Sequence, residues 1–407
     1  MEWELSEREK GFQQIAREFA QSEVLPIASE IDRSGKIPKG LRSKLLDLKF
    51  QSIPLPRKFG GASASMLSFV LAVAEIAKAS PSVAFFTCAS LGGMFPLHFA
   101  GSEEQKAAFL RPLCEGEKLG AFALTEPQAG SDPISMQTTA VREGDEFVLN
   151  GEKAFITNAA LADTYTIIAY TDKAKKHKGM SAFIVEKGTK GMKFTKMADL
   201  LGMRGCIVAG IRLEDCAVPK ENLLGREGDG FKIAMETVNI ERVALSGVGV
   251  GIAEACLELA CEYAKVRKQF SQPIANFEAV QFMLADTATE IEAARLLTFK
   301  AANLADAVLY RFSQEQEQRG LSAEAVAVSQ EERRRKIEAF RKIAAMAKLF
   351  SSEVALRAAS NAVQIHGGFG CTKECPAERF FRDARILSIA VGTSEIQRIT
   401  IAREVLK

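Results

Sequence analysis

Several polar segments of this 407-residue sequence combine hydroxyl, aromatic and glycine residues in ways that suit a flat, phosphorylated ligand. The first is LTEPQAGSDP at 124–133, which follows a β-prone run and offers the hydroxyls of Thr125 and Ser131. Backbone N–H groups and hydroxyls in such a loop can bind a polar heterocycle or a phosphate. An ordinary turn explains the same residues, so this segment alone does not establish a binding site.

Two further segments place an aromatic residue near a polar one. In LNGEKAFITNAALAD (149–163), Phe155 offers a stacking surface and Thr157 a hydroxyl two residues later, and strand alternation puts both on one face. In RKQFSQPIANFEAVQ (267–281), Arg267 can hold a phosphate and Phe270 can cover a base. A core aromatic and a plain helix end are the simpler interpretations of each segment taken alone.

The last polar segments lie near the C-terminus. QIHGGFG at 364–370 has paired glycines that let another backbone or a pyrophosphate approach closely. Further on, Gly392 precedes a helix for which Thr393 or Ser394 is the expected N-cap, and the free N–H groups of a helix start suit phosphate. A tight turn and a plain capped helix fit these residues equally well.

Composition excludes several classes of protein. Lys+Arg 53 against Asp+Glu 51 leaves a net charge of +2, which gives no reason to expect a nucleic-acid binder. Only three histidines make a multi-histidine metal centre improbable, so no metal is expected. Eight cysteines without a CxxC motif indicate reduced thiols and a cytoplasmic protein. The charged start is not a signal peptide, and no run of about 18 apolar residues predicts a transmembrane helix.

Three zones along the chain differ in their hydrophobic pattern. Residues 1–118 show helical spacing, and residues 119–232 hold short β-prone runs separated by turn residues, which favours a barrel or sandwich. Residues 233–407 carry long amphipathic stretches, enough for a four-helix bundle. The sequence therefore predicts a mainly α, α+β multi-domain fold. A highly charged stretch at 311–342, which includes 312–335, predicts a solvent-exposed helical hairpin.

Three glycines at 247, 249 and 251 superficially resemble a dinucleotide fingerprint. A GxGxxG motif starting at Gly247 needs its last glycine where Ile252 stands, and a helical stretch rather than a strand precedes it. We therefore interpret them as small residues that allow close helix packing.

Taken in order, the motifs closely resemble the acyl-CoA dehydrogenase family of flavoproteins over nearly the whole chain. The matching motifs are LTEPQAGSD, KAFITNA, GMRG (202–205), RKQF, QIHGG, RDAR (382–385) and GTSEIQR. The resemblance implies an N-terminal helical domain, a middle β-barrel and a C-terminal four-helix bundle. It also implies FAD as cofactor, an acyl-CoA substrate, electron-transfer flavoprotein as electron acceptor, and a homotetramer built as a dimer of dimers.

The resemblance assigns cofactor contacts residue by residue. Thr125 matches a residue that hydrogen-bonds the flavin ring, Ser131 one that touches flavin and acyl-CoA, and Thr157 a hydroxyl near flavin N5. The 267–270 and 364–368 segments match positions that reach the FAD of a neighbouring subunit, whereas 392–395 match the adenosine end of the subunit's own cofactor. The implied cofactor contacts are Phe122, Leu124, Thr125, Ser131, Phe155, Ile156, Thr157, Arg267, Gln269, Phe270, Gln364, Gly367, Gly368, Gly392, Thr393 and Glu395.

One departure from the family pattern concerns the catalytic base. The commonest family pattern has an aromatic residue and then Glu before the GTS turn, and here these positions are Ala390 and Val391. The isovaleryl-CoA and long-chain branches place the base at the position of Glu241, which stands between Ile240 and Arg242 in a stretch that matches the acyl pocket. The resemblance thus implies Glu241 as catalytic base, with Ser131, Asn239 and Arg242 at the substrate.

The implied reaction removes two hydrogens from an acyl-CoA thioester. A carboxylate in a dry pocket has a raised pKa and takes the α-proton, while a hydride leaves Cβ for flavin N5, giving the trans-2-enoyl-CoA. Two alternatives stay open. Some relatives without the base perform other chemistry on CoA thioesters, such as β-elimination, and a non-catalytic flavin-binding helical protein would share the same helices.

Overall fold

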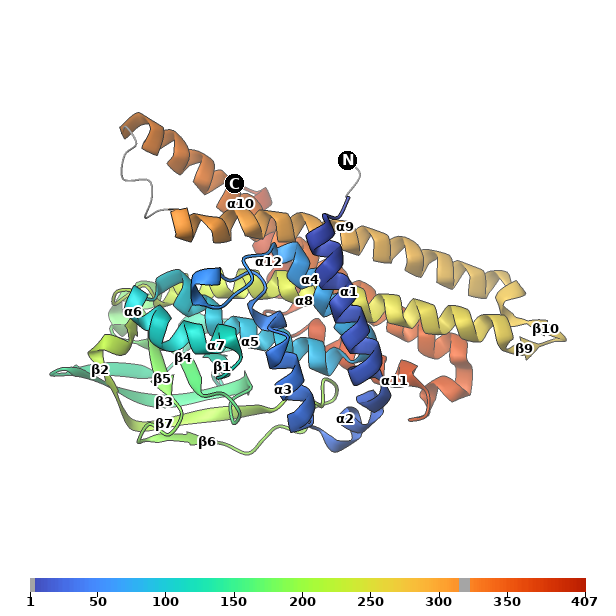
Figure 1. Ribbon diagram of the computed structural model, residues 1–407, viewed down its shortest axis with the longest axis horizontal. Helices are drawn as coiled ribbons and strands as arrows, with labels where there is room; N and C mark the ends of the chain where they lie inside the picture. The colour runs from blue at the N-terminus through green and yellow to red at the C-terminus, as the bar shows by residue number, and fades with distance from the viewer. Residues whose placement is uncertain (1–3, 315–322) are drawn as a thin grey trace.

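The computed structural model describes residues 4–314 and 323–407, in which a β-sheet lies beside a large body of helices (Figure 1). In the described part of the chain seven α-helices precede the sheet, and polar caps begin several of them: Ser6 with Glu9 forms a capping box, and Ser65 caps the fourth helix. Their bounds are α1 (Glu7–Phe19), α2 (Ala28–Ser34), α3 (Lys39–Asp47), α4 (Met66–Ala79), α5 (Pro81–Ala100), α6 (Glu103–Gln105) and α7 (Arg111–Glu115).

Eight strands form one mixed sheet in the order β6-β7-β3-β2-β4-β5-β8, and β1 pairs with β4 in parallel. The sheet has a compact hydrophobic core of its own, to which every strand contributes one face. This core includes Phe147, Tyr165 and Phe183. The strands are β1 (Gly120–Ala123), β2 (Thr139–Glu143), β3 (Glu146–Thr157), β4 (Thr164–Tyr170), β5 (Met180–Glu186), β6 (Met192–Phe194), β7 (Val208–Pro219) and β8 (Leu223–Leu224).

The predicted barrel is not closed. The end strands β6 and β8 have three and two residues and do not pair with each other among the described residues. Strands this short offer too few backbone groups to form a closing ladder, so the sheet stays open. The β-prone runs of the sequence lie at 120–124, 146–149, 165–170, 181–186 and 207–213, so β2, β6 and β8 were not expected.

The C-terminal part is a helical bundle in which α8 is central. Its helices are α8 (Gly230–Val266), α9 (Glu278–Gln314), α10 (Ala323–His366), α11 (Pro376–Leu387) and α12 (Ser394–Val405), with a hairpin of β9 (Lys268–Gln269) and β10 (Gln272–Pro273) between α8 and α9. The prediction that the α8 glycines serve close packing is confirmed. A Cβ on Gly251 would lie 2.2 Å from the Ala74 carbonyl oxygen of α4, and one on Gly249 would lie 2.9 Å from that of Ser351 on α10.

The predicted zone boundaries can be compared with these elements. Position 118/119 lies between α7 and β1, whereas position 232/233 lies inside the first turn of α8. The amphipathic stretches of the C-terminal zone lie at 231–266, 277–311, 323–360 and 393–406, so the short helix α11 was not expected. Of the charged stretch at 311–342, the structure gives the backbone of α9 to Gln314 and of α10 from Ala323. The remaining residues of that predicted hairpin lie outside the described part of the chain, as do the side chains from 310 to 334.

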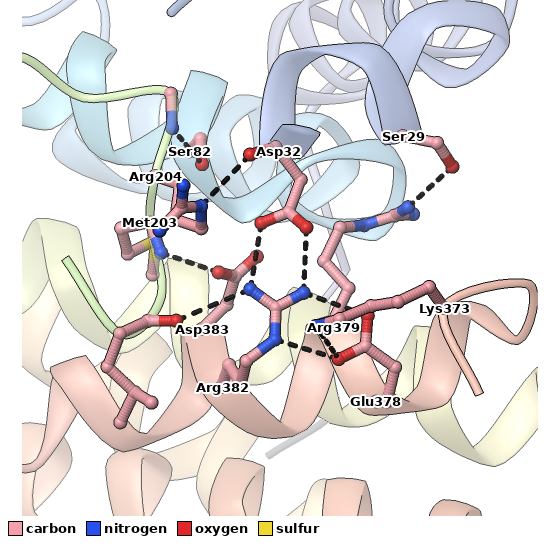
Figure 2. A network of polar contacts seen from close by, with 12 residues as sticks. Ser29, Asp32, Ser82, Met203, Arg204, Lys373, Glu378, Arg379, Arg382 and Asp383 are labelled. Carbon is pink, nitrogen blue, oxygen red and sulfur yellow. Dashed lines mark hydrogen bonds and ion pairs between the residues drawn. The ribbon is translucent and has the colours of Figure 1, made fainter. Parts of the chain in front are cut away.

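A polar network joins the three parts of the chain (Figure 2). Arg382 of α11 forms ion pairs of 2.7 Å with Asp32 of α2 and with Glu378. Next to it, the buried Asp383 accepts a 2.5 Å hydrogen bond from the backbone N–H of Met203, in the GMRG segment between β6 and β7. Burial raises the pKa of Asp383 to about 7. The network therefore holds α2 and α11 against the segment between β6 and β7.

Within residues 4–314 and 323–407, two helices, α5 and α8, are long and apolar enough to cross a bilayer by length and composition. Their most apolar windows are 83% and 78% buried inside the protein, as expected of core helices.

Candidate active site

The carboxylate of Glu241 lies where α8 crosses α5. It sits against Gly92 of α5: a Cβ at residue 92 would lie 1.9 Å from Glu241 Oε1. Burial raises the pKa of Glu241 to about 8. Part of the side chain nevertheless stays accessible, and none of the described residues donates a hydrogen bond or forms an ion pair with it. It is therefore an unpartnered carboxylate that is largely buried but still partly accessible.

The turn that lacks the family glutamate lies on another face of α8. Val391 has a φ of 56° and Gly392 a φ of 90°, so two consecutive residues adopt left-handed backbone. A β-branched residue is unfavourable there, which marks this turn as strained. The guanidinium of Arg242 faces the turn, since a Cβ on Gly392 would lie 3.6 Å from Arg242 Nη2. Glu241 and the turn at Val391 are thus both next to the same turn of α8, because Arg242, which faces the Val391 turn, directly follows Glu241.

Two side chains bind the carbonyl oxygen of Gly392 and hold this turn. Lys348 Nζ of α10 donates a 2.7 Å hydrogen bond to it, and Gln397 Nε2 of α12 donates one of 2.8 Å. Burial, together with the charge of Arg242, lowers the pKa of Lys348 to about 7. Arg242 itself is buried, donates to Asn239 Oδ1 at 2.9 Å, and leaves its Nε without a partner. These cations were not identified as a cluster from the sequence.

Asn239 and Arg242, both expected at the substrate, are buried and engage each other. Glu241 projects toward α5, whereas Arg242 reaches the 391–392 turn. The side chains of Asn239 and Arg242 are therefore largely shielded from solvent.

The loop 124–133 and strand β3 are held side by side by a buried ion pair. Lys153 Nζ of β3 lies 2.8 Å from Glu126 Oε1 and 3.1 Å from the Leu124 carbonyl oxygen. Glu126 also accepts from the backbone N–H groups of Gln137 and Thr138, and the Ala154 N–H donates to the Thr125 carbonyl at 2.9 Å. The two segments expected to face the flavin are therefore neighbours.

The ion pair is charged at neutral pH. Burial opposes ionisation of Glu126, but Lys153 and the hydrogen bonds outweigh it and lower the pKa of Glu126. Burial lowers the pKa of Lys153 to about 8, which Glu126 partly offsets. Glu126 lies in the LTEPQAGSD motif and Lys153 in the KAFITNA motif, but nothing in the linear sequence pairs the two residues, so the sequence alone did not identify the ion pair.

Most of the predicted flavin-facing residues at the end of β3 and in the segment opposite are at least partly exposed. Phe155 is 71% exposed with a φ of 55°, at an irregularity in the pairing of β3 with β7. Thr157 is half-buried, as are Phe122 and Leu124 of the opposing segment, while Ser131 is exposed. Ile156 differs, because its side chain is buried in the sheet core and leaves only its backbone for a cofactor.

The hairpin lies at the opposite end of the molecule from the sheet (Figure 1). Its two loop residues, Phe270 and Ser271, both have positive φ, and Phe270 is 89% exposed. Arg267 and Gln269 are also exposed. The 364–370 segment is next to the hairpin base, because Tyr263 stacks on His366 with ring centroids 4.3 Å apart.

The 364–368 residues face open space. Gln364, Gly367 and Gly368 are exposed, and a Cβ on either glycine would meet nothing within 4 Å. At the other predicted phosphate site, Thr393 is the N-cap of α12 and accepts from the Ile396 N–H, and Glu395 is exposed. The structure thus brings 122–157 together as one group and 267–270 with 364–368 as another. The second group lies far from the sheet of its own chain.

Comparison with known proteins follows the same three parts of the chain. The family models for the acyl-CoA dehydrogenase N-terminal, middle and C-terminal domains match residues 6–117, 121–216, and 228–318 with 309–406. A short-chain specific acyl-CoA dehydrogenase of Clostridium acetobutylicum is 39% identical over 413 residues, covering 100% of both chains. A probable acyl-CoA dehydrogenase of Bacillus subtilis is 42% identical over 410 residues, again with 100% coverage of each.

Solved structures are equally similar. Butyryl-CoA dehydrogenase from Megasphaera elsdenii has a TM-score of 0.89 and 38% identity, covering 100% of both chains. A chain from a structure titled as the electron transferring flavoprotein of Acidaminococcus fermentans has a TM-score of 0.91 and 41% identity, also with 100% coverage of each.

Proposed function

This chain belongs to the acyl-CoA dehydrogenase family of flavin-dependent oxidoreductases, and we propose that it oxidises an acyl-CoA to the trans-2-enoyl-CoA with Glu241 as base. The observation that carries the proposal is the unpartnered carboxylate of Glu241 beside Gly92, with its pKa raised to about 8. A general base works best when its pKa lies near the working pH, and this group meets that condition.

The residues around the sheet fit FAD. Thr125 and Phe155 are held together by the Ala154–Thr125 hydrogen bond, and Phe155 keeps an exposed face in a strained conformation that packing within the chain does not require. The isoalloxazine ring would lie against this surface, and the N-terminus of α12 at Thr393 would bind toward the adenosine end. When bound, FAD supplies the acceptor for the hydride that leaves Cβ.

The chain's own residues account for the remaining steps. Glu241 takes the α-proton and keeps it on its carboxyl group, which burial stabilises in the neutral form. Asn239 and Arg242 close the inner end of the acyl pocket, and Lys348 with Gln397 fixes the turn at Val391. The elimination chemistry of base-less relatives and a purely structural role are less well supported, because neither needs an unpaired buried carboxylate.

The names of relatives bear on substrate and direction. The matched proteins include short-chain specific and butyryl-CoA dehydrogenases, so we expect a short acyl chain. They also include an acryloyl-CoA reductase of Anaerotignum propionicum, 40% identical over 409 residues, so the reverse reaction is a second candidate. Anaerobic titration with acyl-CoAs of increasing length tests both: bleaching of the flavin by a saturated acyl-CoA supports oxidation, and no bleaching by any of them contradicts it.

Partners and assembly are part of the proposal. The caffeyl-CoA reductase–Etf complex subunit of Acetobacterium woodii is 39% identical over 405 residues, which supports electron-transfer flavoprotein as the electron acceptor. The second group of cofactor residues lies far from the sheet, which supports an FAD shared between subunits of a homotetramer. The eight cysteines are all free thiols, which supports a cytoplasmic location.

A further inference from the structure

Two buried cations lie at the turn that links α11 to α12. Arg242 of α8 is 7% exposed, and a Cβ on Gly392 would lie 3.6 Å from its Nη2. Lys348 of α10 is 1% exposed, and its Nζ donates a 2.7 Å hydrogen bond to the Gly392 carbonyl oxygen. Burial and then the charge of Arg242 lower the pKa of Lys348, so the two cationic groups repel each other.

No carboxylate among the described residues forms an ion pair with either cation. The acceptor that Arg242 finds there is neutral, the side-chain oxygen of Asn239 at 2.9 Å. Glu353 and Glu395 raise the pKa of Lys348, but they offset only part of the opposite effect, and the pKa stays at about 7. Glu353 itself accepts a 2.6 Å hydrogen bond from the first residue of α12, and Glu395 is exposed. The part of the chain that the structure describes therefore leaves positive charge at this turn without a counter-ion.

Glu241 does not supply the counter-ion, although it directly precedes Arg242. Burial raises the pKa of Glu241 to about 8, and no cation lowers it again, as a neighbouring guanidinium would. The carboxylate projects toward Gly92 of α5, whereas Arg242 reaches the 391–392 turn. The proposed base and the two cations are therefore separate electrostatic groups.

One edge of the Arg242 guanidinium is free to donate. Its hydrogen bond to Asn239 comes from Nη1, whereas the buried Nε has no acceptor among the residues described. Nε and Nη2 carry the two parallel N–H groups that pair with the two oxygens of a carboxylate. Gln397 Oε1 is also buried without a donor in the described chain, but a neutral amide cannot offset two charges. Because buried charges and buried donors are normally paired, these groups match an anion.

The turn itself limits the size of that anion and leaves access to it. Val391 and Gly392 are half-buried, so this side of the cluster is not sealed by the core. Val391 stands where the commonest family pattern has Glu, and its side chain ends before the point at which a glutamate carries its carboxylate. A small carboxylate from solution has the charge and the planar shape that the free edge of Arg242 fits.

We propose that Arg242 and Lys348 bind a small monocarboxylate, such as formate or acetate, beside the turn at Val391. The anion offsets both positive charges and accepts charge-assisted hydrogen bonds from the guanidinium edge and from the ammonium group. This inference goes beyond the proposed reaction and does not rest on it, because the binding can be measured without turnover.

Thermal unfolding of the FAD-loaded protein in rising concentrations of sodium formate tests the site. A ligand that binds only the folded state raises the unfolding temperature. We expect the rise in the wild type to exceed that in Arg242→Gln by about 2 °C or more, since both proteins share the general effect of the salt. Arg398→Gln removes an exposed arginine of α12 as the matched control and should respond like the wild type. An equal response of the wild type and Arg242→Gln would overturn the proposal.

A second pair of variants keeps the test decisive if Arg242→Gln does not fold. Val391→Glu supplies the carboxylate covalently, whereas Val391→Gln has the same size without the charge. Val391→Glu should unfold at a temperature at least about 2 °C higher than Val391→Gln and should no longer respond to formate. Equal stability of the two variants, or an undiminished formate response in Val391→Glu, would contradict the anion site. If formate binds as expected but no acyl-CoA bleaches the flavin, the anion site stands and the proposed reaction fails.

Discussion

Glu241 and Gly92 are in such close approach that residue 92 tolerates no side chain while the carboxylate stays in place. A Cβ there would lie 1.9 Å from Oε1 and 3.0 Å from the carboxyl carbon of Glu241. The glycine therefore provides the space in which the unpaired carboxylate stands. This relationship between α5 and α8 is the structural basis for assigning the base.

The first prediction follows directly. Gly92→Ala should push the Glu241 carboxylate aside, because the clashing atom is the end of a flexible side chain. Flavin reduction by acyl-CoA should slow by about tenfold or more. Thermal stability should hold or rise slightly, since alanine favours a helix interior by up to about 1 kcal/mol over glycine. Stopped-flow absorbance and thermal unfolding measure the two effects.

The control for that variant is Gly11→Ala in α1, where an added Cβ meets nothing within 4 Å. It should show the same helix effect and an unchanged rate. Equal slowing in both variants would mean that the loss at residue 92 is not specific to the carboxylate.

The pH dependence has a defined sign. With a pKa of about 8, Glu241 is mostly protonated at neutral pH and becomes a base as pH rises. Flavin reduction at low acyl-CoA concentration should therefore rise about tenfold per pH unit below about pH 8 and level off above it. A rate that is flat between about pH 6 and about pH 9 would contradict the raised pKa.

The same group affects stability. The pKa of Glu241 in the folded protein exceeds its ordinary value of 4.5, so the folded state holds its proton more tightly than the unfolded state. Its contribution to the free energy of unfolding is complete below about pH 4.5 and is lost as pH rises through about 8. Glu241→Gln should remove this contribution to the pH dependence, which denaturant unfolding at several pH values would reveal.

A third prediction concerns the buried pair Glu126–Lys153. Lys153→Met leaves the Glu126 carboxylate buried without its cation, which should cost about 3–5 kcal/mol of unfolding free energy and loosen FAD. Lys193→Met is the matched control, because Lys193 pairs with Glu214 at the surface and should cost less than about 1 kcal/mol. Adding Glu126→Gln to Lys153→Met should recover part of the loss. No recovery would mean that the cost arises from packing rather than charge.

The fourth prediction tests the shared cofactor. Arg267→Ala changes an exposed residue beside the hairpin, far from the sheet of its own chain (Figure 1). FAD binding and subunit assembly should weaken together, as measured by retained flavin and by light scattering. A monomeric variant that keeps its full complement of FAD would count against the shared site.

The sequence predicted an N-terminal helical part, a middle sheet and a C-terminal helical part, because the spacing of its hydrophobic residues changes near residues 119 and 232. It missed β2, β6 and β8, and the last two have only three and two residues and no resolvable pattern. The Thr125, Phe155 and Thr157 segments were found through family motifs, and the structure brings them together. Gly92 and Lys153 were not found, because nothing in a linear pattern connects a helical glycine or a strand lysine with a carboxylate far along the chain.

The central claim is that Glu241 is the base, and stopped-flow flavin bleaching by acyl-CoA of Glu241→Gln tests it most directly. This variant keeps the size of the side chain, so it should bind FAD and acyl-CoA yet reduce its flavin at least about 10²-fold more slowly. Combining Glu241→Gly with Val391→Glu should restore part of the rate, because it moves the carboxylate to the strained turn beside Arg242. If Glu241→Gln reduces its flavin as fast as the wild type with the best substrate, Glu241 is not the base and the account is contradicted.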